Sequence, residues 1–584
     1  MNITFRVLRA FYRKLFPIAI RQRLMPWLLA KAVPFGISWS KSKFLMRTSG
    51  AVKLDPATLL LLQMQRYQEA IQVAGQIMTE NPSMAAYICK RILEEDPSIP
   101  QAYVVRAEAF RATGEDQQAA NVAWAACDMG MKLVGDGELA SAVQFFANVA
   151  PAFPDVCEPY ALLYGQINVM TNAHRDMRDK PPASGARRRL VISISVWGER
   201  YTNLFTRYFL PSILSPNNIP ALNRIREILF DLYTIPECVE VIRAAPSFQI
   251  LRRYAKIRFI TFPERILTSP EYQRTPGFRY YIYGGFHHVS IEHARTLGAD
   301  IICIAPDGVH SDGSFYNYAR YIDEGYKAVM FTATRGQAEK LLPILDQLRD
   351  ETTQSLTLPP RTLVELAARH VHHEFQRYIL TKDNRHVPSL LSVMFFPRPN
   401  GFFIRSFHLH PIIIAHEALQ KDIPFDYTTV DDNLVTHLFP DSTDWENIKI
   451  IDDTDDGVMM DIAYINPPHN QPEQTFTPNI LIKQIPNFRA NHFWHFKHRI
   501  IYHCDATLDA IGTYDVQEDG SLVAKTLLVS SAIDMDDEKL EAWFEANKPK
   551  DLREEDRPDH LPLEIGQPSL TLRWMSGKDS SCQS

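Results

Sequence analysis

The sequence has few of the residues and motifs that mark several protein classes. It has 24 glycines among 584 residues and no apolar run near the ~18 residues of a membrane helix, which argues against collagen-like and multi-spanning proteins. Its seven cysteines form no CxxC pair and no close cluster, so we predict neither a disulfide framework nor a structural zinc site. The sequence lacks the motifs GxSxG, GxxxxGK and GxGxxG, and their absence argues against a hydrolase, a kinase and a dehydrogenase, respectively. We expect a folded protein of a reducing compartment.

The charge is distributed unevenly along the chain. Apolar residues make up 46% and charged residues 22%, as in folded proteins, and the formal net charge is −6. Residues 1–54 contain eleven Lys and Arg and no acid, which leaves 51 basic and 68 acidic residues, or −17, for the remainder. An acidic body repels phosphate backbones, so we expect no nucleic-acid partner.

The basic leader, residues 1–54, has the pattern of an amphipathic helix. Its apolar residues at helical spacing are Phe5, Leu8, Tyr12, Phe16 and Ile20. Such a helix can lie on an anionic membrane surface, which predicts a cytoplasmic protein held peripherally at the inner face. Two alternatives stay open: a basic helix packed on the acidic body, and an organelle transit peptide.

Residues 55–178 are rich in alanine and predict a helical domain. The segment 96–130 has a proline start at Pro97 and a turn at Gly114. Its small residues are Ala102, Ala107, Ala119, Ala123 and Ala126. This pattern resembles a tetratricopeptide (TPR) repeat, and degenerate neighbours bring the total to about three units. We expect the domain to contact a protein partner; an ordinary helical bundle is the alternative.

After a polar linker, apolar runs alternate with helical patterns. The predicted strands are 190–196, 227–234, 256–262, 300–308 and 326–334. The predicted helices between them are 200–213, 236–253 and 280–297. Continuous β-branched and aromatic runs are typical of buried parallel strands in an α/β fold, whose ligands bind at the carboxyl ends of the strands. This places Trp197, Thr234 and Asp307 at a predicted site.

The segment 298–315 is the most informative one. An apolar strand delivers Asp307 to its carboxyl end, and Asp312 follows within one loop. A carboxylate there can hold a hard divalent cation, which neutralises a diphosphate. The arrangement resembles nucleotide-sugar glycosyltransferases of the GT-A fold, in which an Asp-x-Asp motif follows a strand and binds the metal of the donor.

This resemblance covers roughly residues 189–505. It implies a Rossmann-like mixed sheet with helices on both faces, and Mn²⁺ or Mg²⁺ held on a nucleotide-diphosphate sugar by Asp307. Trp197 and Thr234 would contact the base or the ribose. The chain departs from the motif, because Ala305 stands where the first Asp is required.

Because the first Asp of the motif is missing, other residues must supply the remaining ligands of the metal. We expect Asp312, His492 or His495 to complete it, since some GT-A enzymes recruit a late histidine. The alternative is that Asp307 only caps a helix or forms a turn, because PDG is a common turn sequence.

A second acidic pair, Asp431 and Asp432, precedes an amphipathic stretch. In GT-A enzymes a late acidic pair resembles the position of the catalytic base, which removes a proton from the acceptor hydroxyl. Capping of the following helix is an equally good interpretation.

Other polar clusters give weaker predictions. His408 and His410 lie two apart in a predicted strand, and His370, His373 and Glu374 are interpreted as a polar helix face. A histidine-metal hydrolase built from these two groups is a third hypothesis, which requires them to meet around one cavity.

The sequence thus predicts a leader (1–54), a TPR-like domain (55–178), a GT-A-like domain (189–533) and an acidic helix with a polar tail (534–584). The predicted function is metal-dependent transfer of a sugar from a nucleotide-diphosphate donor to a protein or glycan acceptor. The rival is a non-catalytic TPR scaffold whose GT-A-like domain has lost its metal motif.

Overall fold

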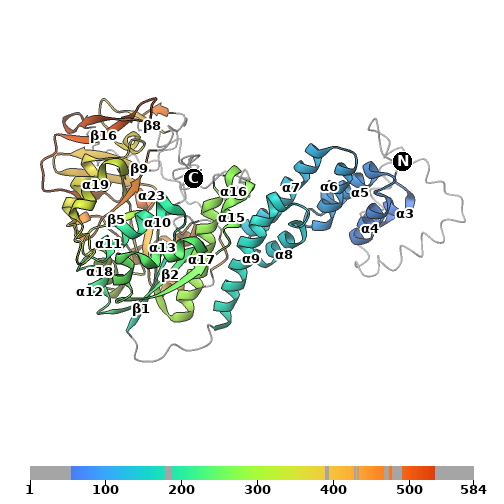
Figure 1. Ribbon diagram of the computed structural model, residues 1–584, viewed down its shortest axis with the longest axis horizontal. Coiled ribbons are helices and arrows are strands. Elements are labelled where there is room, and N and C mark those ends of the chain that lie inside the picture. Colours follow the sequence, from blue (N-terminus) through green and yellow to red (C-terminus); the bar gives the residue numbers. More distant parts are fainter. Residues whose placement is uncertain are drawn as a thin grey trace, which may run out of the picture. The chain divides into compact units, whose positions relative to one another are not determined.

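The computed structural model describes most of the chain, as two compact units (Figure 1). The described residues are 54–177, 187–275, 277–388, 393–421, 423–426, 429–430, 433–465, 473–476 and 490–532. The first unit comprises residues up to Met129 together with Phe145–Phe153, and the second comprises Gly130–Gln144 and the chain from Pro154. Most of the predicted leader, Asp431 and Asp432, and the predicted tail lie outside the described residues.

The first unit is helical. Its helices are α3 (Pro56–Gln63), α4 (Tyr67–Ile77), α5 (Pro82–Glu95), α6 (Pro100–Ala112), the first part of α7 (Asp116–Gly135) and the end of α8 (Leu139–Val149). α4 and α6 begin 33 positions apart, and α5 and α7 begin 34 positions apart, which is the period of a TPR-like repeat. Gly114 makes the turn between α6 and α7 with a φ of +74°.

Small buried residues explain why these helices pack closely. Ala70, Ala74, Ala85, Ala102 and Ala109 are at most 1% exposed and belong to one core cluster. The predicted helix–turn–helix at 96–130 is therefore confirmed, although its first helix begins at Pro100 and not at Pro97.

The second unit is built on a mixed seven-stranded sheet. Its strands, in spatial order, are β12 (Ile448–Ile450), β6 (Ala328–Phe331), β11 (His410–Ile414), β4 (Ala299–Ile304), β1 (Arg188–Ser195), β2 (Arg226–Thr234) and β3 (Ala255–Thr261). β4, β1, β2 and β3 run parallel, and β11 is antiparallel to both of its neighbours. The predicted α/β class and mixed sheet are confirmed.

Helices pack on both faces of this sheet, and for this reason its strands are buried on both sides. Every residue of β4 is buried, as a strand covered on both sides requires. α17 (Phe278–Leu297) packs against β1 and β4 and against α9 (Pro154–Met177), so the second unit begins before the predicted boundary at 178. The other helices of eight or more residues in the described part of this unit are α13 (Pro236–Ala244), α18 (Ser314–Asp323), α19 (Ala338–Leu348), α20 (Pro360–Arg369) and α23 (Ala490–Lys497).

Shorter helices and sheets complete the unit. A helical stretch from α10 (Gly198–Leu204) through the π-helical turn η3 (Phe205–Phe209) to α11 (Leu210–Ile213) follows β1, as predicted for 200–213. One three-stranded sheet joins β5 (Gly308–His310), β13 (Met459–Ala463) and β7 (Thr334–Gln337). Another joins β15 (Ile500–His503), β10 (Gly401–Ser406) and β9 (Val393–Arg398), and two-stranded sheets pair β14 (Glu473–Thr475) with β8 (His386–Pro388) and β16 (Ala510–Val516) with β17 (Leu522–Leu528). Among the described residues, no helix has the length and apolar character needed to cross a membrane.

A buried ion-pair network ties the sheet to α17. Asp231 on β2 is fully buried and accepts hydrogen bonds from the Arg258 guanidinium at 2.9 and 2.8 Å. Its carboxylate also lies 2.8 Å from Nδ1 of His293 and accepts a hydrogen bond from the Ser290 hydroxyl at 3.2 Å. Both oxygens of this carboxylate therefore have partners, which a buried charge requires.

We predict that Asp231→Asn lowers the free energy of unfolding by about 3 kcal/mol, because it leaves the Arg258 charge without its counterion. Urea denaturation at pH 7 measures this value. The matched control is Glu240→Gln, at a side chain that is 78% exposed and pairs only with Arg243, and it is expected to change stability by less than ~0.5 kcal/mol. Equal effects of the two substitutions would contradict the assigned role of the network.

Candidate active site

The strand order puts a topological switch point between β1 and β4. The chain passes from β1 outward through β2 and β3 and then returns to the other side of β1 as β4. Parallel sheets bind ligands at such a switch point, beyond the carboxyl ends of the strands. Trp197 follows β1 and Asp307 follows β4, so the structure brings these two predicted residues to the same edge of the sheet.

A second carboxylate, Asp461, lies beside Asp307. β5 and β13 pair antiparallel with Asp461 opposite Gly308, and the Ile462 N–H donates to the Asp307 carbonyl at 2.9 Å. Gly308 has no side chain, and the Met459 side chain fills the space that a Cβ atom there would need. The two carboxylates are both partly buried and lie 154 residues apart in the chain, Asp307 in the turn before β5 and Asp461 on β13.

The two carboxylates perturb each other. Burial raises the pKa of Asp307, and the positive charges of Arg335, Arg279 and Arg200 oppose this rise. Burial and the negative charge of Asp307 together raise the pKa of Asp461 to about 7. The pair therefore holds a proton at a pH at which an isolated aspartate is ionised, which is a property of acid–base and cation sites.

The pH dependence of stability follows from this shift. Because the folded protein binds the proton more tightly than the unfolded chain does, the contribution of Asp461 to stability is greatest below pH ~4 and is lost as the pH rises to about 7. We predict that Asp461→Asn is more stable than the parent at pH 8 by about 1–2 kcal/mol, and that this advantage disappears near pH 4. Urea denaturation in the presence of a chelator measures both values. Exposed Asp441→Asn is the control, and an advantage of Asp461→Asn that does not change with pH would contradict the assignment.

Three arginines place positive charge around the two carboxylates. Arg335 lies on β7 directly beside Asp461 in the parallel register, and the Arg200 guanidinium lies 4.1 Å from the ring centroid of Tyr464. Arg279, on α17, also acts on the charge of Asp307. Three cations around two carboxylates favour an anionic ligand such as a diphosphate.

Aromatic side chains form a wall next to the carboxylates. The ring of Trp197 lies 5.0 Å from that of Tyr283 and 5.6 Å from that of Phe262, and its Nε1–H donates to the Tyr272 hydroxyl at 3.4 Å. Burial, with the nearby Tyr201 and Asp307, raises the pKa of Tyr283 well above its usual value. Tyr283 therefore links Trp197 to the surroundings of Asp307.

The other predicted site residues do not join this group. Thr234 is completely buried on β2 and offers no surface to a ligand. Asp312 accepts hydrogen bonds from the backbone N–H of Asn217 at 2.9 Å and from its side-chain amide at 2.7 Å, so both carboxylate oxygens organise a loop. Asp431 and Asp432 lie outside the described residues and remain a prediction.

His492 and His495 lie in a separate cluster with His408. The ring centroids of His492 and His408 are 4.4 Å apart, and Nδ1 of His495 lies 3.1 Å from the Phe407 carbonyl. Burial lowers the pKa of His495 to about 3. In the described part of the chain, no contact joins this cluster to Asp307.

The predicted polar helix face at 370–374 is wrong, because α20 ends at Arg369. His370 instead lies 2.8 Å from the Tyr514 hydroxyl, while His372 and His373 turn inward and are 0% and 6% exposed. Nitrogen and oxygen atoms of His372, His373 and Glu374 lie within 4.8 Å of one another, a spacing that suits a metal. However, Nε2 of His372 lies 2.9 Å from the Tyr464 carbonyl, and its Nδ1 accepts from the Glu374 N–H at 3.3 Å. With both ring nitrogens bonded, His372 is a poor ligand.

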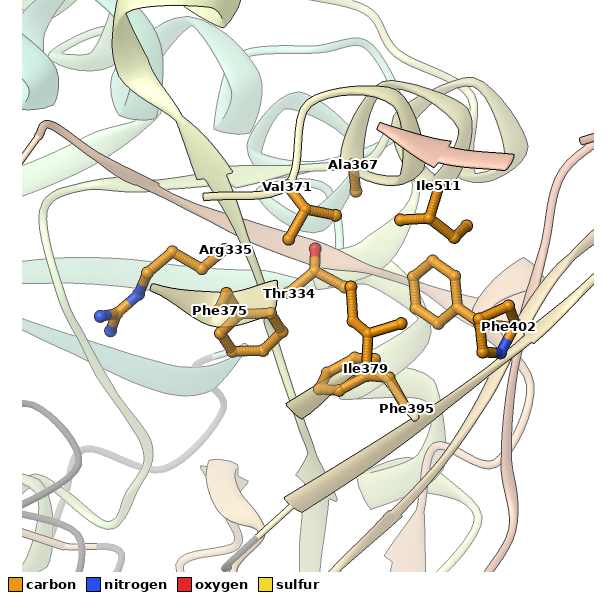
Figure 2. A pocket seen from close by; sticks show the side chains of 10 residues that line it. Thr334, Arg335, Ala367, Val371, Phe375, Ile379, Phe395, Phe402 and Ile511 are labelled. Atoms are coloured by element: carbon orange, nitrogen blue, oxygen red, sulfur yellow. The ribbon is translucent and has the colours of Figure 1, made fainter. Parts of the chain in front are cut away.

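A small, mainly apolar cavity lies beside β7 (Figure 2). It has a volume of about 10 Å³, room for roughly one water molecule. It is lined by Thr334, Arg335, Ala367, Val371, Phe375, Ile379, Phe395, Pro397, Phe402 and Ile511. Figure 2 shows the Arg335 side chain extending away from the other labelled side chains. The cavity is too small for a substrate.

The cavity contains a buried hydroxyl that costs stability. Thr334 is 4% exposed, and among the described residues its Oγ1 has no hydrogen-bond partner. We predict that Thr334→Val raises the free energy of unfolding by about 1 kcal/mol, because it removes an unsatisfied polar atom at nearly constant volume. Thr513→Val is the matched control: its hydroxyl donates to the Val371 carbonyl at 3.2 Å, so the same change is expected to cost about 1 kcal/mol. Thermal or urea unfolding of both variants checks the opposite signs.

Comparisons with known proteins do not identify a family. No family model and no curated protein matches the chain. Among solved structures, a mutant O-GlcNAc transferase of Thermobaculum terrenum matches with 13% identity, 44% of this chain and 51% of that chain covered, and a TM-score of 0.13. The chain thus spans about half the length of that protein, and so low a TM-score shows no common fold.

Proposed function

We propose that the second unit is a glycosyltransferase whose donor is a nucleotide-diphosphate sugar. The observation that carries this proposal is the convergence of Asp307 with Arg200, Arg279 and Arg335 at the switch point of the sheet. A diphosphate needs such positive charge, and the adjoining wall of Trp197 offers an aromatic surface to a base or ribose. The mixed sheet and the position of Asp307 in the turn after β4 support the GT-A resemblance found in the sequence.

Each residue has a distinct task under this proposal. The arginines bind and orient the phosphates, and Trp197 with Tyr283 limits the volume open to the nucleoside. A divalent cation, when bound, would neutralise the leaving diphosphate. The expected bases, Asp431 and Asp432, would take the proton of the acceptor hydroxyl, and a protein or glycan acceptor would be recruited by the helical first unit.

The proposal is tested by measuring binding of UDP-, GDP-, CDP- and dTDP-linked sugars by titration calorimetry, with and without Mn²⁺. We predict that one class binds, and that Asp307→Asn and Arg335→Gln each weaken its affinity at least tenfold. Asp441→Asn and Arg252→Gln, the same chemical changes at exposed positions, are expected to leave it unchanged. Absence of binding by every donor, or unchanged affinity in Asp307→Asn, would refute the proposal.

The second candidate is a non-catalytic scaffold. It is favoured by Ala305, which replaces the first Asp of the expected motif. A scaffold needs the helical repeats but not the arginines. If it is correct, Arg335→Gln binds protein partners normally and the parent protein neither binds nor turns over any sugar nucleotide.

A further inference from the structure

One of the three arginines of the candidate site lies against an aromatic ring. Arg200 is the third residue of α10, the helix that follows β1 and Trp197, and it is half-buried. Its guanidinium lies 4.1 Å from the ring centroid of Tyr464, within the ~6 Å over which the face of an aromatic ring attracts a cation. Tyr464 directly follows β13, so this contact joins Arg200 to the strand that carries Asp461.

Two hydrogen bonds fix the backbone that carries the Tyr464 ring. Nε2–H of His372 donates to the Tyr464 carbonyl at 2.9 Å, and the N–H of the next residue, Ile465, donates to the Glu339 carboxylate at 2.9 Å. Glu339 lies on α19, and His372 lies beyond the end of α20. Two separate segments therefore hold the backbone after β13, and the ring has a defined position from which it contacts Arg200.

The hydrogen bonds of His372 determine its tautomer as well as its position. Its Nδ1 accepts from the Glu374 N–H at 3.3 Å, so the ring proton lies on Nε2, which donates to the Tyr464 carbonyl. The backbone N–H of His372 donates to the Arg335 carbonyl at 2.9 Å. His372 is 0% exposed, and burial with the positive charges of Arg335 and Arg200 holds its pKa well below the usual value. This neutral imidazole thus links the Arg335 backbone to Tyr464 without adding a charge.

We propose that Tyr464 and His372 are positioning residues that hold Arg200 where it binds the diphosphate of the ligand. An arginine side chain has many rotamers, and holding it in place before the ligand arrives removes part of the entropic cost of binding. His372 is fully buried and acts through Tyr464, without touching the ligand. The inference rests on the proposed function, because the same arginine binds the donor there, and it deepens that function by assigning how the phosphate site is ordered.

The test measures binding of inorganic pyrophosphate to the full chain by titration calorimetry, with a chelator present to remove metal ions. We expect Arg200→Gln to weaken the affinity at least tenfold and Tyr464→Leu to weaken it about fivefold. Tyr464→Phe keeps the ring, so its affinity is expected to stay within about twofold of the parent. The matched control is Phe259→Leu on β3, which removes a ring 5.0 Å from the Arg243 guanidinium and is expected to leave the affinity unchanged.

A double-mutant cycle separates positioning from a general structural effect. If Tyr464 acts through Arg200, Tyr464→Leu has no further effect in the Arg200→Gln variant. His372→Leu removes the donor to the Tyr464 carbonyl and is expected to weaken binding about fivefold, as Tyr464→Leu does. His372→Gln has an amide that can donate to the same carbonyl and is expected to restore the affinity. Circular dichroism verifies folding, and the cycle at half-buried Tyr464 decides the question if His372→Leu does not fold.

Three results would overturn the inference: full affinity in Tyr464→Leu, the same loss from Tyr464→Leu with and without Arg200, or no pyrophosphate binding by the parent. These outcomes are separable from those of the proposed function. Pyrophosphate binding with the expected cycle, but without binding of any sugar nucleotide, would refute the transferase alone. Sugar-nucleotide binding that Tyr464→Leu leaves unchanged would refute the positioning role alone.

Discussion

The pairing of β5 with β13 is the constraint on which the site depends. Three residue pairs place Asp461 beside Asp307 at the carboxyl end of β4, and the neighbouring strand β7 adds Arg335 to the same row. Without this small sheet, the switch point between β1 and β4 would have a single carboxylate. The repulsion between the two carboxylates is tolerated because the fold fixes both backbones, as functional sites often require at a cost in stability.

Positively charged side chains gather at the candidate site, although the net charge of the chain after residue 54 is negative. The chain after residue 54 has a formal charge of −17, which argues against binding a long polyanion. Arg200, Arg279 and Arg335 nevertheless all act on the charge of Asp307, and near them the local field and not the net charge determines what binds. A small anion can therefore bind to an acidic protein.

Local patterns predicted much of the fold. The strands β1 to β4, the helix–turn–helix at Pro100–Gly135 and the position of Asp307 all follow from short stretches of sequence whose apolar period is clear. A strand was predicted around His410, but its antiparallel direction in β11 was not, because a buried antiparallel strand has the same apolar run as a parallel one. His372 points inward because α20 ends before it, and the local sequence specifies the end of a helix poorly.

Asp461 could not have been found from its neighbours in the sequence. It follows two methionines in an ordinary strand, and its importance comes from a pairing across 154 residues. Asp312, in contrast, lies near Asp307 in sequence, yet its carboxylate is used by Asn217.

The most direct test is a crystal structure with Mn²⁺ and the nucleoside diphosphate that binds best, with the metal located by anomalous scattering. The account predicts the metal at Asp307 and the diphosphate against the three arginines; a metal at the histidine clusters, or a nucleotide bound away from the ends of β1 and β4, would contradict it.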